Sequence, residues 1–120
     1  MKLPESEEKL MQLLWKNGPA YLKDILAAYP EPKPAKTTVA TLLSRLRKRG
    51  AVDYKTHGNS RQYFAVLTKA AYFGSHLRRW IDNFFGASPT AFASFFTDEA
   101  DLTQAQLTEL RDLIDRKIDK

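Results

Sequence analysis

The chain has 120 residues, an apolar fraction of 43% and a net charge of +5, and it contains no cysteine. This length suits one compact domain or a small domain with an appendage, and the apolar fraction suffices for a hydrophobic core. The lack of cysteine excludes disulfides, thiolate metal sites and thiol catalysis, and no stretch approaches the roughly 20 apolar residues of a membrane span. We therefore expect a cytoplasmic protein with no signal peptide and no membrane insertion.

The positive charge is concentrated in the first half of the chain. Residues 1–66 carry 12 Lys and Arg against 6 Asp and Glu, whereas residues 67–120 carry 7 against 8. Within residues 33–61 there are eight cations, and Asp53 is the single anion. This distribution is typical of a surface that meets a polyanion, although a solvated basic face has the same composition. The placement of the cations decides between the two interpretations.

Three helices are predicted within the first 50 residues. Leu10 and Leu14 give the first helix its apolar spacing, and it ends at Gly18-Pro19. A short second helix over "YLKDILAAYP" stops before Pro30, and the proline-rich "PEPKPAK" that follows predicts an extended connection. The third helix is expected to begin near Thr37.

The third helix has two chemically distinct faces. On a helical wheel, its apolar residues Val39, Leu42, Leu43 and Leu46 form one stripe of the usual core width. The opposite face carries hydroxyls and cations and contains no acid: Thr37, Thr38, Thr41, Ser44, Arg45 and Lys48. A solvating face is more often mixed in sign, because mixed signs form intrahelical pairs, so this face favours contact with DNA.

A β-hairpin is predicted after the third helix. The segment "GAVDYKTHGNSRQYFAVL" contains two stretches of strand character around the turn-rich "THGNS". Three helices followed by a two-stranded hairpin indicate a winged helix-turn-helix. We predict that DNA is contacted from the third helix and the wing, through Lys36, Thr37, Thr38, Thr41, Ser44, Arg45, Lys48, Lys55, Asn59, Ser60 and Arg61. Thr41 and Arg45 are expected to read bases, and Lys48 and Arg61 to bind phosphates.

The second half of the chain is predicted to form three further helices. The first begins near Thr68 and ends near Gly86, Ser88-Pro89 opens the second, and Thr103 with Gln106 forms a capping box for the third. We predict that their apolar side chains mediate dimerisation: Phe73, Leu77, Trp80, Ile81, Phe84, Phe92, Phe95, Phe96, Leu107, Leu110, Ile114 and Ile118.

Dimerisation is preferred because the second half is too short to bury its aromatic residues alone. Eight of the fourteen aromatic residues lie between Tyr72 and Phe96. The alternative is that the helices fold back on the winged helix, but isologous pairing of two copies buries the same surface twice. We expect a DNA-binding domain over 1–67 and a helical dimerisation region over 68–120.

Enzymatic activity is not expected. His57 and His76 are the two histidines, and neither belongs to a catalytic triad or a metal motif, so both are interpreted as surface or packing residues. Asp112, Asp115 and Asp119 lie on a last helix that is rich in Arg and Lys, so ion pairing explains these acids better than catalysis. No glycine-rich phosphate loop occurs. We therefore predict no metal, no cofactor and no catalytic residue.

Several stretches resemble the penicillinase-repressor family of bacterial regulators, the BlaI/MecI/CopY type. These are "EEKLMQLLWKNGPAYLKDIL", "TTVATLLSRLRKRGAVD", "SRQYFAVL" and "FFTDEADLTQAQLTELRDLID", which together cover nearly the whole chain. The resemblance implies a dimeric winged-helix repressor that binds a palindromic operator and dimerises through its C-terminal helices.

Two departures from the family bear on induction. The copper-responsive branch uses a C-terminal cysteine cluster, which this chain lacks. In the β-lactam-responsive branch, a membrane-bound sensor metalloprotease cleaves an Asn-Phe bond, whose matching positions here are Phe95 and Phe96. The Asn is not retained, so release by proteolysis at this bond is a hypothesis.

The expected fold is therefore mainly α with a small β-hairpin: a winged helix-turn-helix followed by C-terminal dimerisation helices. The expected function is a sequence-specific DNA-binding repressor that acts as a homodimer on a palindromic operator. The alternative is a winged-helix interaction module that binds an acidic protein and not DNA. RNA binding is disfavoured, because the sequence offers no exposed aromatic platform for stacking bases.

Overall fold

A computed structural model describes residues 1–119 and divides the chain into two compact units, one of residues 1–76 and one that begins at Leu77. The elements are α1 (Glu5–Asn17), β1 (Ala20–Tyr21), α2 (Leu22–Ala28), α3 (Lys36–Lys48), β2 (Val52–His57), β3 (Ser60–Ala65), α4 (Lys69–Phe84), α5 (Pro89–Glu99) and α6 (Gln104–Ile118). The predicted fold class is confirmed. The division between the units falls inside α4, and the predicted boundary after residue 67 stays a prediction.

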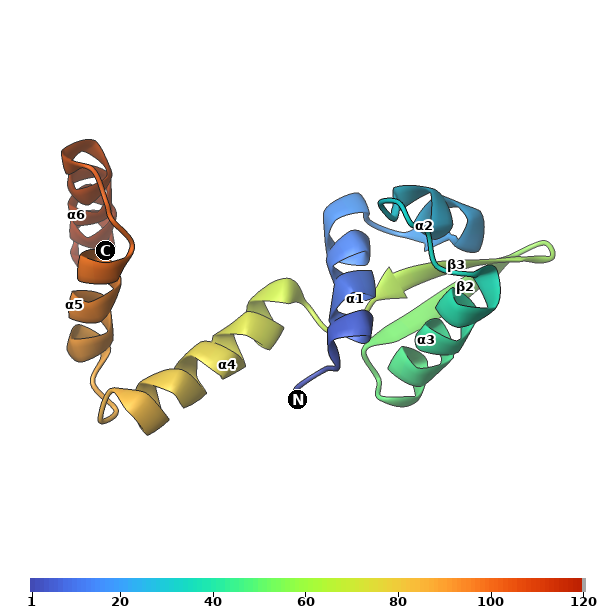
Figure 1. Cartoon of the computed structure of the whole chain (residues 1–120), viewed down its shortest axis with the longest axis horizontal. Coiled ribbons are helices and arrows are strands. Elements are labelled where there is room, and N and C mark those ends of the chain that lie inside the picture. The colour runs from blue at the N-terminus through green and yellow to red at the C-terminus, as the bar shows by residue number, and fades with distance from the viewer. Residues whose placement is uncertain (120) are drawn as a thin grey trace. The chain divides into compact units, whose positions relative to one another are not determined.

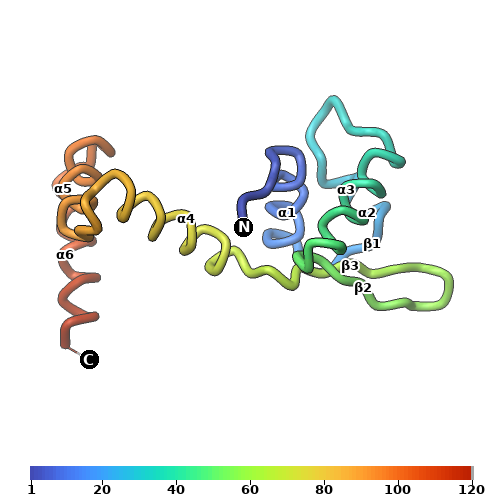
Figure 2. The backbone as a smooth tube through the Cα atoms, turned by 90° about the horizontal axis from the view of Figure 1, so that it is seen from below, coloured from blue at the N-terminus to red at the C-terminus, as the bar shows by residue number. Residues whose placement is uncertain are grey.

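The first unit combines three helices with a small antiparallel sheet whose strand order is β1-β3-β2 (Figure 1). Strands β2 and β3 form the predicted hairpin, in register from Val52 opposite Ala65 to His57 opposite Ser60. The hairpin extends away from the helices as a wing (Figure 2). The third strand, β1, was not predicted, and its Ala20 pairs with Tyr63.

The core of the first unit forms around the apolar stripe of α3. Val39, Leu42, Leu43 and Leu46 are all buried, as predicted. They belong to one cluster with buried residues of α1, α2 and the start of β2, among them Leu10, Met11, Leu14, Ile25 and Val52. This packing fixes the rotation of α3, so the opposite face of the helix is turned to solvent.

The first turn of α4 is part of this core through Tyr72, which is 1% exposed. The Tyr72 hydroxyl donates to Glu8 Oε2 at 2.7 Å and accepts the backbone N–H of Leu3 at 3.1 Å. Nearby, Trp15 Nε1 donates to the carbonyl of Leu67 at 2.8 Å. Hydrogen bonds from α1 and from Leu3 thus hold the start of α4, and the residue Leu67 before it, in the first unit.

The second unit contains α5 and α6, and both predicted helix caps are confirmed. Ser88 caps α5 by accepting the backbone N–H of Ala91, and Thr103 forms a capping box with Gln106 at the start of α6. Phe85 lies against Phe92 and Phe95 of α5, with ring centroids 5.5 and 5.4 Å apart. Neither α5 nor α6 contains a fully buried residue, so their apolar side chains are exposed or half-buried.

Candidate nucleic-acid interface

The exposed side of α3 forms a continuous polar surface, which we call the recognition face: Thr37, Thr38, Thr41, Ser44, Arg45 and Lys48. All six residues are exposed, as the helical wheel predicts, and no acidic residue occurs in α3. Thr41 Oγ1 donates to the carbonyl of Thr37 at 3.0 Å, so its proton is engaged within the helix. The Thr41 hydroxyl oxygen and methyl group remain for contacts with a partner.

Three of the eight cations in residues 33–61 are engaged in holding the fold. Lys33 donates to the carbonyls at the end of α2, at 3.2 Å to Leu26, 3.0 Å to Ala27 and 2.6 Å to Tyr29. The other two are Arg47, which pairs with Asp53, and Arg49, which pairs with Glu7. Glu7 is 2% exposed, so its carboxylate depends on Arg49 for charge compensation.

The other five cations have no ion pair among residues 1–119, and all five belong to the predicted DNA-binding set: Lys36, Arg45, Lys48, Lys55 and Arg61. All five are also exposed. A cation without a carboxylate partner remains available to neutralise an external anion. The structure therefore separates cations that stabilise the fold from exposed cations that have no ion pair within the described residues.

The tip of the wing is a two-residue turn between His57 and Ser60. Its first central residue, Gly58, has a φ of 62°, whereas Asn59 has a negative φ, the arrangement of a type II′ turn. A side chain at Gly58 would be strained in this conformation, so glycine is required there. The predicted contact residues Asn59, Ser60 and Arg61 follow directly and are all exposed.

A groove of about 730 Å³ separates the wing from the helices, and we call it the wing groove. It is lined by Tyr21, Leu22, Lys23, Lys36, His57, Asn59, Ser60, Arg61 and Tyr63. Four of these were predicted to bind DNA, whereas Tyr21, Lys23, His57 and Tyr63 were not. Pairing of β1 with β3 brings Tyr21 beside the wing, a contact that no local sequence pattern indicates. His57 Nε2 lies 3.1 Å from Gln62 Oε1, so the histidine is fixed within the wing.

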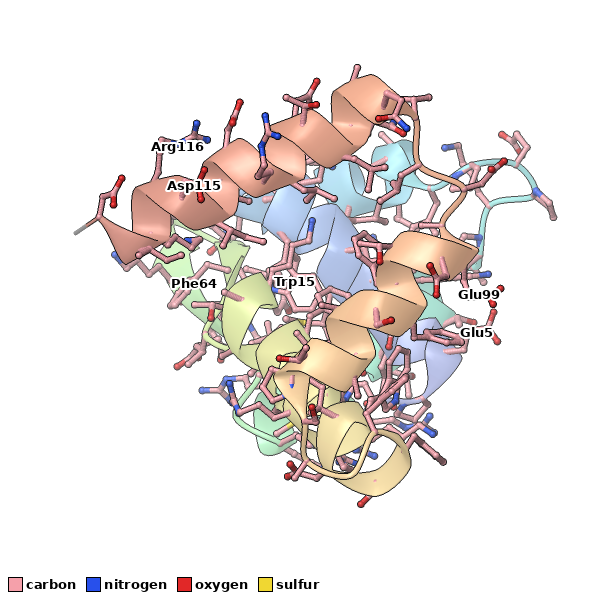
Figure 3. The ribbon with its side chains drawn as sticks, turned by 90° about the vertical axis from the view of Figure 1, so that its left-hand side faces the viewer. Glu5, Trp15, Phe64, Glu99, Asp115 and Arg116 are labelled. Carbon is pink, nitrogen blue, oxygen red and sulfur yellow. The ribbon has the colours of Figure 1, made fainter. Side chains whose placement is uncertain are left out.

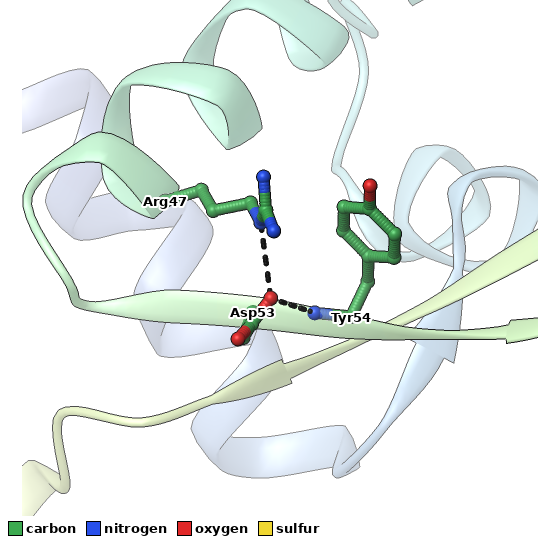
Figure 4. A network of polar contacts seen from close by, with 3 residues as sticks. All are labelled: Arg47, Asp53 and Tyr54. Atoms are coloured by element: carbon green, nitrogen blue, oxygen red, sulfur yellow. Dashed lines mark hydrogen bonds and ion pairs between the residues drawn. The ribbon is translucent and has the colours of Figure 1, made fainter.

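Arg47, Asp53 and Tyr54 form a polar network between α3 and β2 (Figure 4). One carboxylate oxygen of Asp53 accepts both Arg47 Nε at 3.0 Å and the backbone N–H of Tyr54 at 2.8 Å. The hydrogen bond from Arg47, and after it the one from Tyr54, lowers the pKa of Asp53 below its ordinary 3.8. The same bond to Asp53, followed by the Tyr54 side chain, raises the pKa of Arg47. Both groups therefore stay charged and paired at neutral pH.

Most of the predicted dimerisation residues are exposed in the single chain. Exposed are Phe73, Leu77, Trp80, Phe84, Phe95, Phe96, Ile114 and Ile118; Ile81, Phe92, Leu107 and Leu110 are half-buried. Phe73 also packs against Trp15, with ring centroids 5.7 Å apart. The sequence analysis missed Leu113, which is exposed and lines a groove of about 490 Å³ with Phe96, Leu102 and Leu110. Asp115 and Arg116 project from α6 as polar neighbours of the apolar stripe (Figure 3).

We also searched the described residues for metal sites and for membrane-spanning helices. No group of three or more His, Asp or Glu side chains within residues 1–119 is placed to hold a metal ion. Over the same part of the chain, none of the helices combines the length and apolarity needed to cross a bilayer.

Comparison with known proteins identifies one family and several similar proteins. The sequence model of the family described as penicillinase repressor matches residues 3–116. The methicillin resistance regulatory protein MecI of Staphylococcus aureus strain N315 is 22% identical over 117 residues, which are 97% of this chain and 95% of that protein. MecI of Mammaliicoccus sciuri is 21% identical over the same length. A solved structure on the regulation of DNA binding of Bordetella bronchiseptica BpsR by 6-hydroxynicotinic acid matches with a TM-score of 0.49 and 18% identity, over 99% of this chain and 77% of that chain.

Proposed function

The chain belongs to the penicillinase repressor family of DNA-binding transcriptional repressors, and on this premise we propose that it acts as a homodimer on a palindromic operator. The recognition face carries the proposal. It is exposed and free of acids, and it contains two of the five cations that have no ion pair within residues 1–119; the other three are Lys36, Lys55 and Arg61. Hydroxyl and guanidinium groups on such a face suit base edges in the major groove, while lysines suit phosphates.

We propose that the wing groove binds the sugar-phosphate backbone beside the major groove. Lys23, Lys36 and Arg61 give the groove its positive charge, and Asn59 and Ser60 supply neutral hydrogen-bonding groups. Contacts of this kind fix the register of the protein on the duplex without reading its sequence. Tyr21, Lys23, His57 and Tyr63 are thereby added to the proposed DNA interface.

A homodimer explains the unburied apolar surface of the last three helices. Phe84 is 76% exposed and Ile118 is 70% exposed, values unusual for large apolar side chains of a monomer. Pairing of two copies about a two-fold axis covers these residues and places two recognition faces on one operator. Repression would then result from occlusion of the promoter, in the cytoplasm, without a cofactor.

Proteolytic release is the form of induction that we propose for testing. The bond between Phe95 and Phe96 lies in α5, which has no buried residue, so local opening of this helix loses little packing. A membrane-bound sensor metalloprotease is the corresponding partner. If a β-lactam induces the target genes while the chain stays at full length, this mode of release is wrong.

The test of DNA binding is a gel shift and footprint on DNA upstream of the gene, with random DNA as competitor, across a salt series. We expect a protected two-fold symmetric site and a log–log salt slope of about −3 to −4.5 per protomer, for three to five phosphate contacts. A complex with little salt dependence, or equal affinity for both DNAs, would contradict the proposal. Binding to an acidic protein without operator binding would support the alternative interaction module.

A further inference from the structure

Two arginine side chains from different elements lie against the ring of Tyr54 on β2. The guanidinium carbon of Arg47, from α3, is 4.5 Å from the ring centroid, and that of Arg61, from β3, is also 4.5 Å away. Tyr63 packs against the same ring with its centroid 5.5 Å distant. Tyr54 therefore connects the recognition helix to the wing through contacts with two cations.

The two arginines differ in how their charge is compensated. Arg47 is paired with Asp53, whose carboxylate oxygen also accepts the backbone N–H of Tyr54, so this side of the network is anchored to α3. Arg61 has no ion pair among residues 1–119, is exposed, and lines the wing groove. Its guanidinium stacks on the Tyr54 ring, which leaves the N–H donors in the guanidinium plane available.

We propose that Tyr54 is a positioning residue, whose ring holds the Arg61 guanidinium in place for a phosphate of the DNA backbone at the wing groove. This inference rests on the proposed DNA-binding function. An arginine that is free in solution loses rotamer freedom when it binds a phosphate, and stacking on a fixed ring removes part of this cost beforehand. Arg47, which is held by Asp53, packs against the same ring, and we assign neither residue a contact with DNA.

The test is a double-mutant cycle in the full-length chain, measured by the dissociation constant for operator and random DNA. Tyr54→Leu is expected to weaken binding to both DNAs by about 2- to 10-fold, because the entropic cost of ordering the Arg61 side chain then reduces the free energy of binding. Tyr54→Phe keeps the ring and is expected to restore binding to within about twofold. In an Arg61→Ala background, Tyr54→Leu is expected to have no further effect, because the residue it positions is absent.

Several results would overturn the inference. Additive losses in the double mutant would assign Tyr54 a role independent of Arg61, and an equal loss in Tyr54→Phe would assign the role to the hydroxyl. Unchanged binding in Tyr54→Leu would also contradict it. A wild-type chain that shows no salt-dependent DNA binding contradicts the proposed function instead, and the two failures are thereby distinguished.

A measurement on the wild-type chain covers the case in which Tyr54→Leu does not fold. A guanidinium stacked on the ring places the Arg61 δ-protons in the ring current, so their NMR resonances are expected upfield of those of an exposed arginine such as Arg111. The upfield shift is expected to persist in Tyr54→Phe. Arg61 resonances at ordinary positions in the free protein would show that the ring does not hold the side chain and would refute the proposal.

Discussion

At the scale of single residues, Arg45 and Lys48 lie on the same exposed face of α3, but their chemistry suits different parts of DNA. A planar guanidinium like that of Arg45 suits bidentate hydrogen bonds with guanine, whereas an ammonium like that of Lys48 acts as a point charge. We expect Arg45→Ala to cost about 1–3 kcal/mol on the operator and to relax sequence discrimination. Lys48→Ala is expected to weaken all sequences alike and to reduce the salt slope by about one.

Competition gel shifts at several salt concentrations measure both effects. Lys9→Ala is the matched control, because Lys9 is an exposed cation of α1 that already pairs with Glu5 at 3.7 Å. It is expected to change neither affinity nor salt slope. Equal losses on operator and random DNA for both Arg45→Ala and Lys48→Ala would refute the division between base and phosphate contacts.

The Asp53 carboxylate makes the stability of the polar network of Arg47, Asp53 and Tyr54 depend on pH. Its pKa is lowered in the folded state by Arg47, so its contribution to stability is present above the unfolded-state pKa of 3.8 and is lost as the pH falls through the folded-state value. Asp53→Asn keeps the size and one acceptor but removes the charge. We expect the variant to melt at a lower temperature than the wild type at pH 7, with a difference that shrinks below about pH 4. A difference in melting temperature that is constant down to about pH 2.5 would contradict this assignment.

The sequence alone locates the basic surface but does not reveal which cations are free. Each of the three cations engaged in the fold has its partner on another element. Lys33 binds backbone carbonyls at the end of α2, Arg47 pairs with Asp53 on β2, and Arg49 pairs with Glu7 on α1. A count of charges cannot distinguish among the eight cations, because it does not show which of them form ion pairs. Helical periodicity nevertheless selected the exposed residues of α3, because burial of the leucine stripe fixes the orientation of the helix.

At the scale of elements, local signals predicted the helices well and missed the contacts between them. Ser88 and Thr103 were identifiable as caps because a cap is formed by residues within one turn. Strand β1 has two residues, too few for any periodicity to appear. Tyr72 looks from the sequence like another member of an apolar helix, but its hydroxyl binds Leu3 and Glu8, more than 60 residues away.

The hydrogen bonds of Tyr72 predict how strongly the start of α4 is held to the first unit. Tyr72→Phe removes the acceptor of the Leu3 N–H and the donor to Glu8 while retaining the buried ring. We expect a loss of about 1–3 kcal/mol in the free energy of unfolding, because a buried backbone donor loses its partner. Urea denaturation followed by Trp fluorescence measures it.

Tyr29→Phe is the matched control for this experiment. The Tyr29 hydroxyl is also buried, but it has no hydrogen-bond partner among the described residues, and burial raises its pKa. Removal of this hydroxyl is therefore expected to leave stability unchanged or to increase it by up to about 2 kcal/mol. Equal destabilisation by Tyr29→Phe and Tyr72→Phe would show that the long-range hydrogen bonds of Tyr72 contribute little.

At the scale of the whole molecule, charge and apolar surface are assigned to different parts of the chain. The excess of cations lies in residues 1–66, whereas the large side chains that are most exposed lie on α4 and α6. Each unit therefore presents one unsatisfied surface, the first to a polyanion and the second to an apolar partner. In the proposed homodimer a second copy would cover the second surface and double the first, so we expect affinity for a two-fold symmetric site to depend on assembly.

The apolar stripe of α6 provides the test of this dependence. Ile114 and Ile118 are 55% and 70% exposed one turn apart, and carboxylates at both positions would be buried without partners in a dimer. We expect the Ile114→Asp, Ile118→Asp double variant to raise the dimer dissociation constant by at least about 100-fold, measured by sedimentation equilibrium. The double variant is also expected to bind an isolated half-site with the affinity of the wild type. It should lose the higher affinity that a dimer has for two half-sites spaced by about 10 base pairs or a multiple of that distance. Thr108→Asp adds one carboxylate, half the charge of the double variant, at an exposed polar position of α6 and is expected to leave the dimer intact. A wild-type chain that sediments as a monomer at micromolar concentration would remove the homodimer from the proposed function.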